Sequence, residues 1–287
     1  MAILSQPQLR PVLATAMGRL AGRVQLLIAD LKHSNDPEKL HELRVSLRRL
    51  GTMIALHRKY LDKTRAARRR KQIKTLAAFS NPTREAQVEL ALLRALGEGK
   101  WGSLEARLSQ TSDAELAKLR TVWLPKLSDF NRALIADVAA GRLFASCGKN
   151  YLIVQREIIK KQGKRLESSL SKIHSQKQRR RIHQARVKIK EMRYLLDLYQ
   201  IKKSQKFRKK LTQLQTCLGE VHDNQVFQEH LSQLKLTPAD ATALARLRAI
   251  LKRQEKQDFK QFRQQFEQVK LAHSIHQLRR QLKAHAA

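Results

Sequence analysis

The segment His41-Glu42-Leu43-Arg44-Val45-Ser46-Leu47-Arg48 has a counterpart in His183-Gln184-Ala185-Arg186-Val187-Lys188-Ile189-Lys190. Each segment places a cation three and seven residues after a histidine, with mainly small or apolar residues between them. At about 100° per residue, these positions lie along one side of a helix. Like charges at this spacing repel one another. A row of this kind that occurs twice therefore predicts that an anionic ligand neutralises both copies.

We name these sets the first row (His41, Arg44 and Arg48) and the second row (His183, Arg186 and Lys190). Each row lies beside the apolar stripe of its helix rather than opposite it, so the stems of its side chains can pack along a groove between helices. Arg193 extends the second row by one turn, whereas Gly51 occupies the equivalent place in the first. Arginines beside a histidine should discourage its protonation until a phosphate neutralises them.

The composition predicts an all-α fold. The 287 residues include 59 Lys and Arg against 24 Asp and Glu, a formal net charge of +35, with only 10 Gly and 6 Pro. So strong a positive charge opposes compaction and attracts anionic partners such as nucleic acid, anionic membranes or polyphosphate. The hydrophobic content of 42% argues for a folded core rather than disorder.

Helical periodicity runs through almost the whole chain, without convincing strand alternation. A first helix over residues 20–31 should end at Ser34-Asn35-Asp36-Pro37, where Asp36 caps the next helix and Pro37 opens it. A third helix should stop near Asn81-Pro82. Residues 97–102 are predicted to form a loop, and residues 113–149 a less basic helical stretch.

The second half repeats the first in several places. An offset of 142 residues aligns Arg19 with Lys161 and Arg23 with Arg165, and an offset of 138 aligns Arg70 with Arg208. The alternative is that helices rich in Leu and Arg resemble one another by composition. We favour an internal duplication, with units at residues 1–145 and 146–287 that join near residues 141–150.

The chain resembles the CHAD family, the conserved histidine α-helical domain. The resemblance rests on residues 36–50, on the second row followed by Met192-Arg193-Tyr194, and on Leu218-Gly219-Glu220-Val221-His222-Asp223-Asn224-Gln225-Val226. It covers about residues 5–280. Two departures are Gly51, where the pattern usually has a cation, and Arg84-Glu85 and His222-Asp223, where Arg-Asp is more usual.

The resemblance implies two helical bundles related by a pseudo-twofold axis, with a basic central cavity between them. It also implies binding of inorganic polyphosphate and association with polyphosphate granules. No ExExK signature of the CYTH domain, which often accompanies this family, occurs in the sequence. The candidate polyphosphate-binding residues are His41, Arg44, Arg48, His183, Arg186, Lys190, Arg193, Arg19, Arg23, Lys161, Arg165, Arg70 and Arg208.

We expect a binding protein rather than an enzyme, without a cofactor or metal. The stretch Gly141 to Asn150 departs from the P-loop pattern, and the histidines lack metal-ligand spacing. His222-Asp223 suggests a pair at the start of a helix more than a phosphohydrolase motif. Cys147 and Cys217 lack CxxC spacing, and neither a signal peptide nor a membrane span is expected, so we predict a cytoplasmic protein whose oligomeric state is open.

Two alternatives stay open. A run of cations is often simply a solvated helix face, which is our interpretation of Arg69-Arg70-Lys71 as a run and of Arg179 to Arg181. The charge also suits non-specific binding of nucleic acid, although single-strand binders usually interleave aromatic residues with cations and only 5% of the residues are aromatic. The helix with Phe259, Phe262, Phe266 and Val269 is predicted to be core rather than a partner surface.

Overall fold

The computed structural model of the chain describes residues 8–97, 101–145, 150–201, 204–233 and 238–284. These residues form helices joined by short turns, and no strand occurs among them beyond the isolated bridges Gln8–Asn150 and Leu61–Phe144. The predicted all-α class is confirmed. The expected loop at residues 97–102 lies partly outside the described residues.

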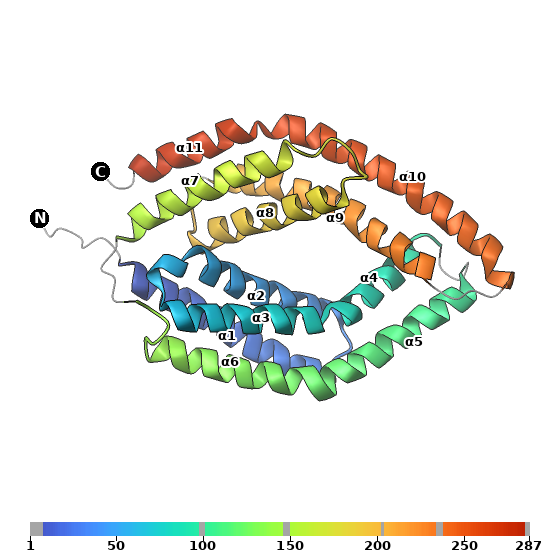
Figure 1. Cartoon of the computed structure of the whole chain (residues 1–287), viewed down its shortest axis with the longest axis horizontal. Helices are drawn as coiled ribbons and strands as arrows, with labels where there is room; N and C mark the ends of the chain where they lie inside the picture. Colours follow the sequence, from blue (N-terminus) through green and yellow to red (C-terminus); the bar gives the residue numbers. More distant parts are fainter. Residues whose placement is uncertain (1–7, 98–100, 146–149, 202–203, 234–237, 285–287) are drawn as a thin grey trace, which may run out of the picture. The chain divides into compact units, whose positions relative to one another are not determined.

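The chain divides into two compact units, Met1–Tyr151 and Leu152–Ala287. The first contains α1 (Leu9–His33), α2 (Pro37–Leu56), α3 (Lys63–Phe79), α4 (Asn81–Ala95), α5 (Gly102–Lys118) and α6 (Leu124–Ala139) (Figure 1). The second contains α7 (Tyr151–Leu170), α8 (Arg179–Leu198), α9 (Gln205–Gln233), α10 (Pro238–Val269) and α11 (Leu271–Ala284).

The predicted start of α2 is confirmed, and so is the predicted end of α3 near Asn81-Pro82, since α3 stops at Phe79. The Asp36 side chain accepts a hydrogen bond of 2.8 Å from the backbone N–H of Glu38, and Pro37 opens the helix. One N–H of the first turn is thereby satisfied, and proline lacks another. The helical prediction for residues 113–149 is wrong at its end, because α6 stops at Ala139 and Gly141 turns the chain with a φ of 68°. Residues 146–149 lie outside the described residues.

Helix α1 forms the centre of the first unit, where it packs against α2 and α6. By length and composition α1 would also be able to cross a membrane, a test that core helices of soluble proteins also pass. Its side chains at Leu13, Leu27 and Leu31 are fully buried against its neighbours. Burial of this apolar stripe stabilises the packing of α1 against its neighbours.

A π-helical segment, Leu119–Trp123, bends the chain between α5 and α6 (Figure 1). Such a segment widens the helix by one residue per turn and is a common cause of kinks. The bend allows α6 to pack on α1 while α5 packs on α4. Trp123 anchors it: its ring is fully buried, and Nε1 donates a 2.7 Å hydrogen bond to the Leu76 carbonyl.

In the second unit, α9 packs against both α8 and α10. Helix α7 approaches α11 closely at Gly163, where an added Cβ would lie 2.8 Å from Ile275. A larger residue would push the two helices apart at this point. In α10, Phe259, Phe262 and Val269 are buried and Phe266 is half-buried, so the prediction that this face is core is confirmed.

Several arginines donate to backbone carbonyls at the C-terminal ends of helices. Arg120 donates to the carbonyls of Leu31 and Ser34 at the end of α1, with distances of 3.0 and 2.7 Å. Arg248 bonds the Leu231 carbonyl near the end of α9. The last carbonyls of a helix lack partners within the helix and carry its negative dipole end, so a guanidinium there is favourable.

Arg69 is buried in an ion pair, so its part in the predicted solvated run is wrong. Its Nε and Nη2 donate to Asp137 Oδ2 at 3.0 and 2.6 Å, and both side chains are only 4% exposed. Burial alone would raise the pKa of the Asp137 carboxyl, but hydrogen bonds from Arg69 and Arg142 outweigh it and lower that pKa. This pair could not be predicted from local spacing, because its partners come from α3 and α6.

Replacing Asp137 with Ala should lower the free energy of unfolding by about 3 kcal/mol, because the buried Arg69 guanidinium would lose its counter-charge. Chemical denaturation followed by circular dichroism measures the change. Asp129→Ala is the control, since its ion pair with Arg132 is exposed and should contribute little. Equal stability of the two variants would contradict a structural role for the Arg69–Asp137 pair.

Candidate basic groove and cationic rows

Helix α8 carries cations on both borders of its buried stripe. The second row lies on the border next to α9, where Arg186 contacts Asp223 and Arg193 contacts Gln215. Arg181 and Lys188 lie on the opposite border, next to α7. The two sets therefore face different neighbours, although each has cations seven residues apart.

The arginines next to α9 are partly used to hold the helices together. Arg186 Nη1 donates a 3.1 Å hydrogen bond to Asp223 Oδ1, and its side chain is only 13% exposed. Among the described residues, the buried Nε of Arg186 has no hydrogen-bond partner. Arg193 Nη1 donates to Gln215 Oε1 at 2.7 Å. The second row therefore braces α8 against α9, with some donor capacity left over.

His183 from the second row lies beside His222 of α9, with ring centroids 5.2 Å apart. Burial lowers the pKa of His222 to about 4, and the nearby Arg186 adds to the effect. The pKa of His183 is lowered as well, first by burial and then by Arg186 and Lys190. The expected suppression of protonation is present at His183, but burial contributes more to it than the cations do.

In the first row, Arg44 braces the junction between α3 and α4. It donates to the Ala77 carbonyl at 3.1 Å, to Asn81 Oδ1 at 2.8 Å and to Ser80 Oγ. Burial, followed by the nearby Arg48 and Arg84, lowers the pKa of Arg44 to about 10. Arg48 donates its Nε to the Arg44 carbonyl at 3.3 Å, and His41 is half-buried.

The other candidate residues fall into three groups. Arg23 is paired with Glu42, and Arg208 is paired with Asp197. Lys190 is half-buried. The exposed candidates are Arg19, Arg70, Lys161 and Arg165. Of the whole set, the structure brings Arg165 into a groove; the assignment of the others to a ligand stays a prediction.

His222 and Asp223 lie in the middle of α9, so the expectation that they start a helix is wrong. The buried neighbours Asn224 and Gln225 tie this part of α9 to other elements. Asn224 Nδ2 donates to the Leu251 carbonyl of α10 at 3.1 Å. Gln225 Nε2 donates at 2.7 Å to both the Gln176 carbonyl of the α7–α8 loop and Glu255 of α10. This motif therefore fixes the α7–α8 loop.

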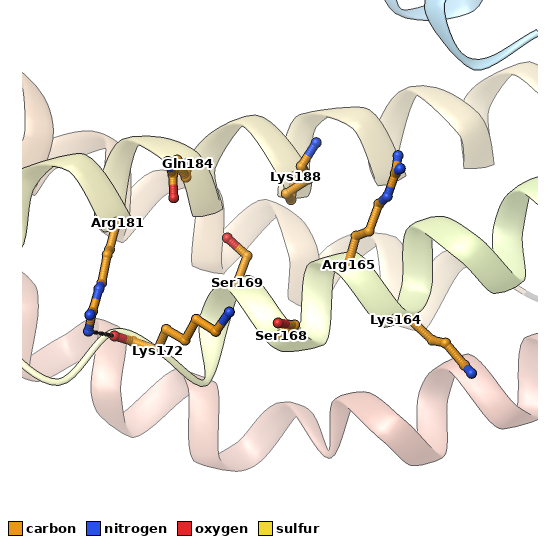
Figure 2. Close-up of a pocket in the computed structure, with 8 residues that line it drawn as sticks. All are labelled: Lys164, Arg165, Ser168, Ser169, Lys172, Arg181, Gln184 and Lys188. Carbon is orange, nitrogen blue, oxygen red and sulfur yellow. Dashed lines mark hydrogen bonds between the residues drawn. The ribbon is translucent and has the colours of Figure 1, made fainter.

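A groove of about 400 Å³ runs between α7 and α8. We call it the α7–α8 groove; Figure 2 shows its side chains. Its lining residues are Lys164, Arg165, Ser168, Ser169, Lys172, Arg181, Gln184 and Lys188. Five of these are Lys or Arg, and no carboxylate is among them. The rest offer hydroxyl or amide groups, so every lining residue is able to donate a hydrogen bond.

The cations of the groove differ in how they are held. Arg181 Nη1 donates to the Lys172 carbonyl at 3.0 Å, which closes the α7–α8 loop (Figure 2). Lys188 Nζ is paired with Glu191 at 2.8 Å, just beside the groove. Lys164, Arg165 and Lys172 are exposed. Anchored and exposed donors along one channel suit a ligand with several anionic groups in line.

Among the groove residues, only Arg165 was predicted from the sequence as a ligand contact, and Arg181 was interpreted as part of a solvated run. The groove residues have a sequence spacing similar to that of the two cationic rows. Lys164 and Ser168 lie four residues apart on α7, Lys172 follows four residues later in the turn after the helix, and Gln184 and Lys188 follow Arg181 by three and seven residues along α8. Only the packing of α7 beside α8 shows that these two faces line one groove.

The remaining chemistry is sparse in the part of the chain that the structure describes. No group of three His, Cys, Asp or Glu side chains lies close enough there to hold a metal ion. Cys217 is a free, buried thiol whose pKa is raised, mainly by burial. Cys147 and part of the Gly141 to Asn150 stretch lie outside the described residues.

The CHAD domain model matches residues 12–232 and 157–286, so the chain belongs to the CHAD domain family. The structure is similar to PptA from Streptomyces chartreusis, with a TM-score of 0.71 and 16% identity over 91% of this chain and all of that one. It is also similar to the CHAD domain from the plant Ricinus communis, with a TM-score of 0.73 and 20% identity over 90% of each chain. No curated protein matches.

Replacing His222 with Gln should make the stability less dependent on pH. The folded-state pKa of about 4 lies below the ordinary 6.5, so below pH 6.5 the unfolded chain binds a proton that the folded chain excludes. Stability is therefore lost as the pH falls from 6.5 to 4, by on the order of 2 kcal/mol for this residue. Urea denaturation at pH 7, 6, 5 and 4 measures the difference between the proteins.

His276→Gln is the matched control, because His276 is exposed on α11. That variant should follow the pH dependence of the unchanged protein. If the His222 variant followed it too, the buried imidazole would not be a source of the acid sensitivity.

Proposed function

We propose that this protein binds inorganic polyphosphate through the α7–α8 groove, as a non-catalytic module. The observation that carries the proposal is the lining of the groove: five cations and no carboxylate. Cations held this close repel one another, and a polyanion in the groove would relieve that repulsion. Membership of the CHAD domain family supports the same ligand class.

The chemistry of the lining favours polyphosphate over a nucleic acid. Polyphosphate is a flexible line of charges without bases, so its site needs donors rather than stacking surfaces. The groove lining contains Lys, Arg, Ser and Gln, and no aromatic residue is among the described residues that form it. Binding of single-stranded nucleic acid usually depends on aromatic platforms. Contacts with duplex phosphates would need no such platform.

In this proposal, the arginines of the two cationic rows are mainly structural. Because Arg44 and Arg186 are held by bonds within their own units, we assign them first to bracing. The ligand contacts at the groove fall to its exposed cations, with Lys161 of α7 beside them, whereas Arg19 and Arg70 stay candidate contacts within the first unit. The internal duplication and the basic central cavity implied by the resemblance belong to the proposal, as do a cytoplasmic location and association with polyphosphate granules.

Removing three exposed charges from the groove should weaken polyphosphate binding by roughly 100-fold, because each charge-assisted contact contributes about 1 kcal/mol in salt solution. The variant is Lys164→Gln, Arg165→Gln and Lys172→Gln combined. Isothermal titration calorimetry at physiological salt measures the affinity, and circular dichroism checks that the helices are intact.

A matched control removes the same charge from α10. Arg253, Lys256 and Lys260 are exposed there, and their replacement with Gln should change the affinity by less than about threefold, since only the general field is lost. Equal losses in the two triple variants would mean that net charge, rather than the groove, determines binding.

Competition between polymers separates the two ligand classes. Labelled polyphosphate is displaced from the protein by unlabelled polyphosphate or by duplex DNA, at matched phosphate concentration and physiological salt. We expect polyphosphate to compete at least about tenfold better, since a flexible chain can enter a groove that a stiff duplex has to span. Preference for DNA would favour nucleic-acid binding instead.

A further inference from the structure

Five arginines gather at one corner of the first unit, where α3 begins and α6 ends. We call this cluster the arginine corner; Arg65, Arg68, Arg69 and Arg142 surround the carboxylate of Asp137, and Arg10 lies beside Gly141 at the same turn. Backbone hydrogen bonds hold the segments of this corner together. The Asp62 N–H donates to the Leu143 carbonyl at 3.0 Å, and the Ala145 N–H donates to the Tyr60 carbonyl at 3.2 Å.

Asp137 satisfies only part of this positive charge. Arg69 takes Oδ2 with two hydrogen bonds, and Arg142 Nε donates to Oδ1 at 3.1 Å. Arg65 Nη1 and Arg68 Nη2 approach the same carboxylate only to 3.6 and 3.8 Å, beyond hydrogen-bond distance. Four guanidinium groups therefore surround one negative charge.

The backbone adds to the positive potential. Helix α3 starts at Lys63, and the N-terminus of a helix carries a partial positive charge. Asp62 caps this end by accepting from the Arg65 N–H at 2.7 Å. No acidic residue follows in the first turn, whereas Lys63 and Arg65 lie within it. The Asp62 carboxylate offsets only part of the positive charge of this helix end and of its two cations.

The cluster is both accessible and fixed in place. The side chains of Arg65, Arg68 and Arg142 are 40%, 57% and 48% exposed. The guanidinium of Arg10 occupies the space that a side chain at Gly141 would need, and it lies 5.8 Å from the centre of the Phe144 ring. The guanidinium groups of the corner are therefore accessible to solvent, and backbone hydrogen bonds hold the turn that carries them.

We propose that Arg65, Arg68 and Arg142 bind a phosphate oxyanion, either free phosphate or one phosphoryl group of a longer chain. Guanidinium groups match the tetrahedral oxygens of phosphate in pairs. The buried Arg69–Asp137 ion pair carries no net charge and supports these three arginines from the interior. This site belongs to the first unit alone, so it is separate from the α7–α8 groove and does not depend on the function proposed for that groove.

The test removes the two arginines that Asp137 does not hold by hydrogen bonds. Arg65→Gln combined with Arg68→Gln leaves the buried Arg69–Asp137 pair intact, so the fold should be preserved. Inorganic phosphate and tripolyphosphate are titrated separately into the full chain by calorimetry. We expect saturable binding, weakened at least about tenfold in the double variant because two charge-assisted contacts are lost.

Arg253→Gln with Arg246→Gln is the control, because both arginines are exposed on α10; it should bind both ligands as the full chain does. Weakening with both ligands identifies a site for free phosphate, and weakening with tripolyphosphate alone identifies a site for a chain phosphoryl group. Unchanged affinity for both ligands, or equal loss in the control, overturns the proposal. The same titrations of the groove triple variant separate the two sites, because loss of the groove charges should leave binding at the arginine corner unchanged.

Discussion

The constraint behind this structure is a shortage of negative charge. With 59 Lys and Arg against 24 Asp and Glu, most cations have no carboxylate to pair with. The fold uses carbonyl groups instead, as Arg44, Arg120 and Arg181 show at the ends of α3, α1 and α7. Helix ends supply unpaired carbonyls and a negative dipole, so the helical architecture itself supplies acceptors that the composition lacks.

This arrangement separates the basic residues into two populations. Arg69 and Arg186 form ion pairs with carboxylates and are largely buried. Lys164, Arg165 and Lys172 stay exposed beside a hollow. A ligand is expected to meet the second population, because a donor that holds two helices together cannot be withdrawn without loss of stability. In the proposed function, net charge attracts the anion, whereas the exposed donors determine where it binds.

The sequence predicted the helices and their faces because those depend on local rules. The Asp36-Pro37 cap and the burial of Phe262 follow from neighbours a few residues away. The bracing roles of Arg44 and Arg186 could not be predicted, since spacing shows which face a cation occupies but not what lies opposite. Arg69 was misinterpreted for the same reason, because its partner Asp137 comes from a distant helix.

The α7–α8 loop, anchored by Gln225 at the Gln176 carbonyl and by Arg263 at the Ile173 carbonyl, has a further consequence. Since the loop cannot easily swing, the spacing of α7 and α8 is set before any ligand arrives. If the groove binds a polymer as proposed, the loss of conformational freedom on association would fall mainly on that polymer, because the protein is preorganised. Short, stiff oligomers and long, flexible ones would then differ in affinity because they lose different amounts of conformational entropy, and not because the protein rearranges.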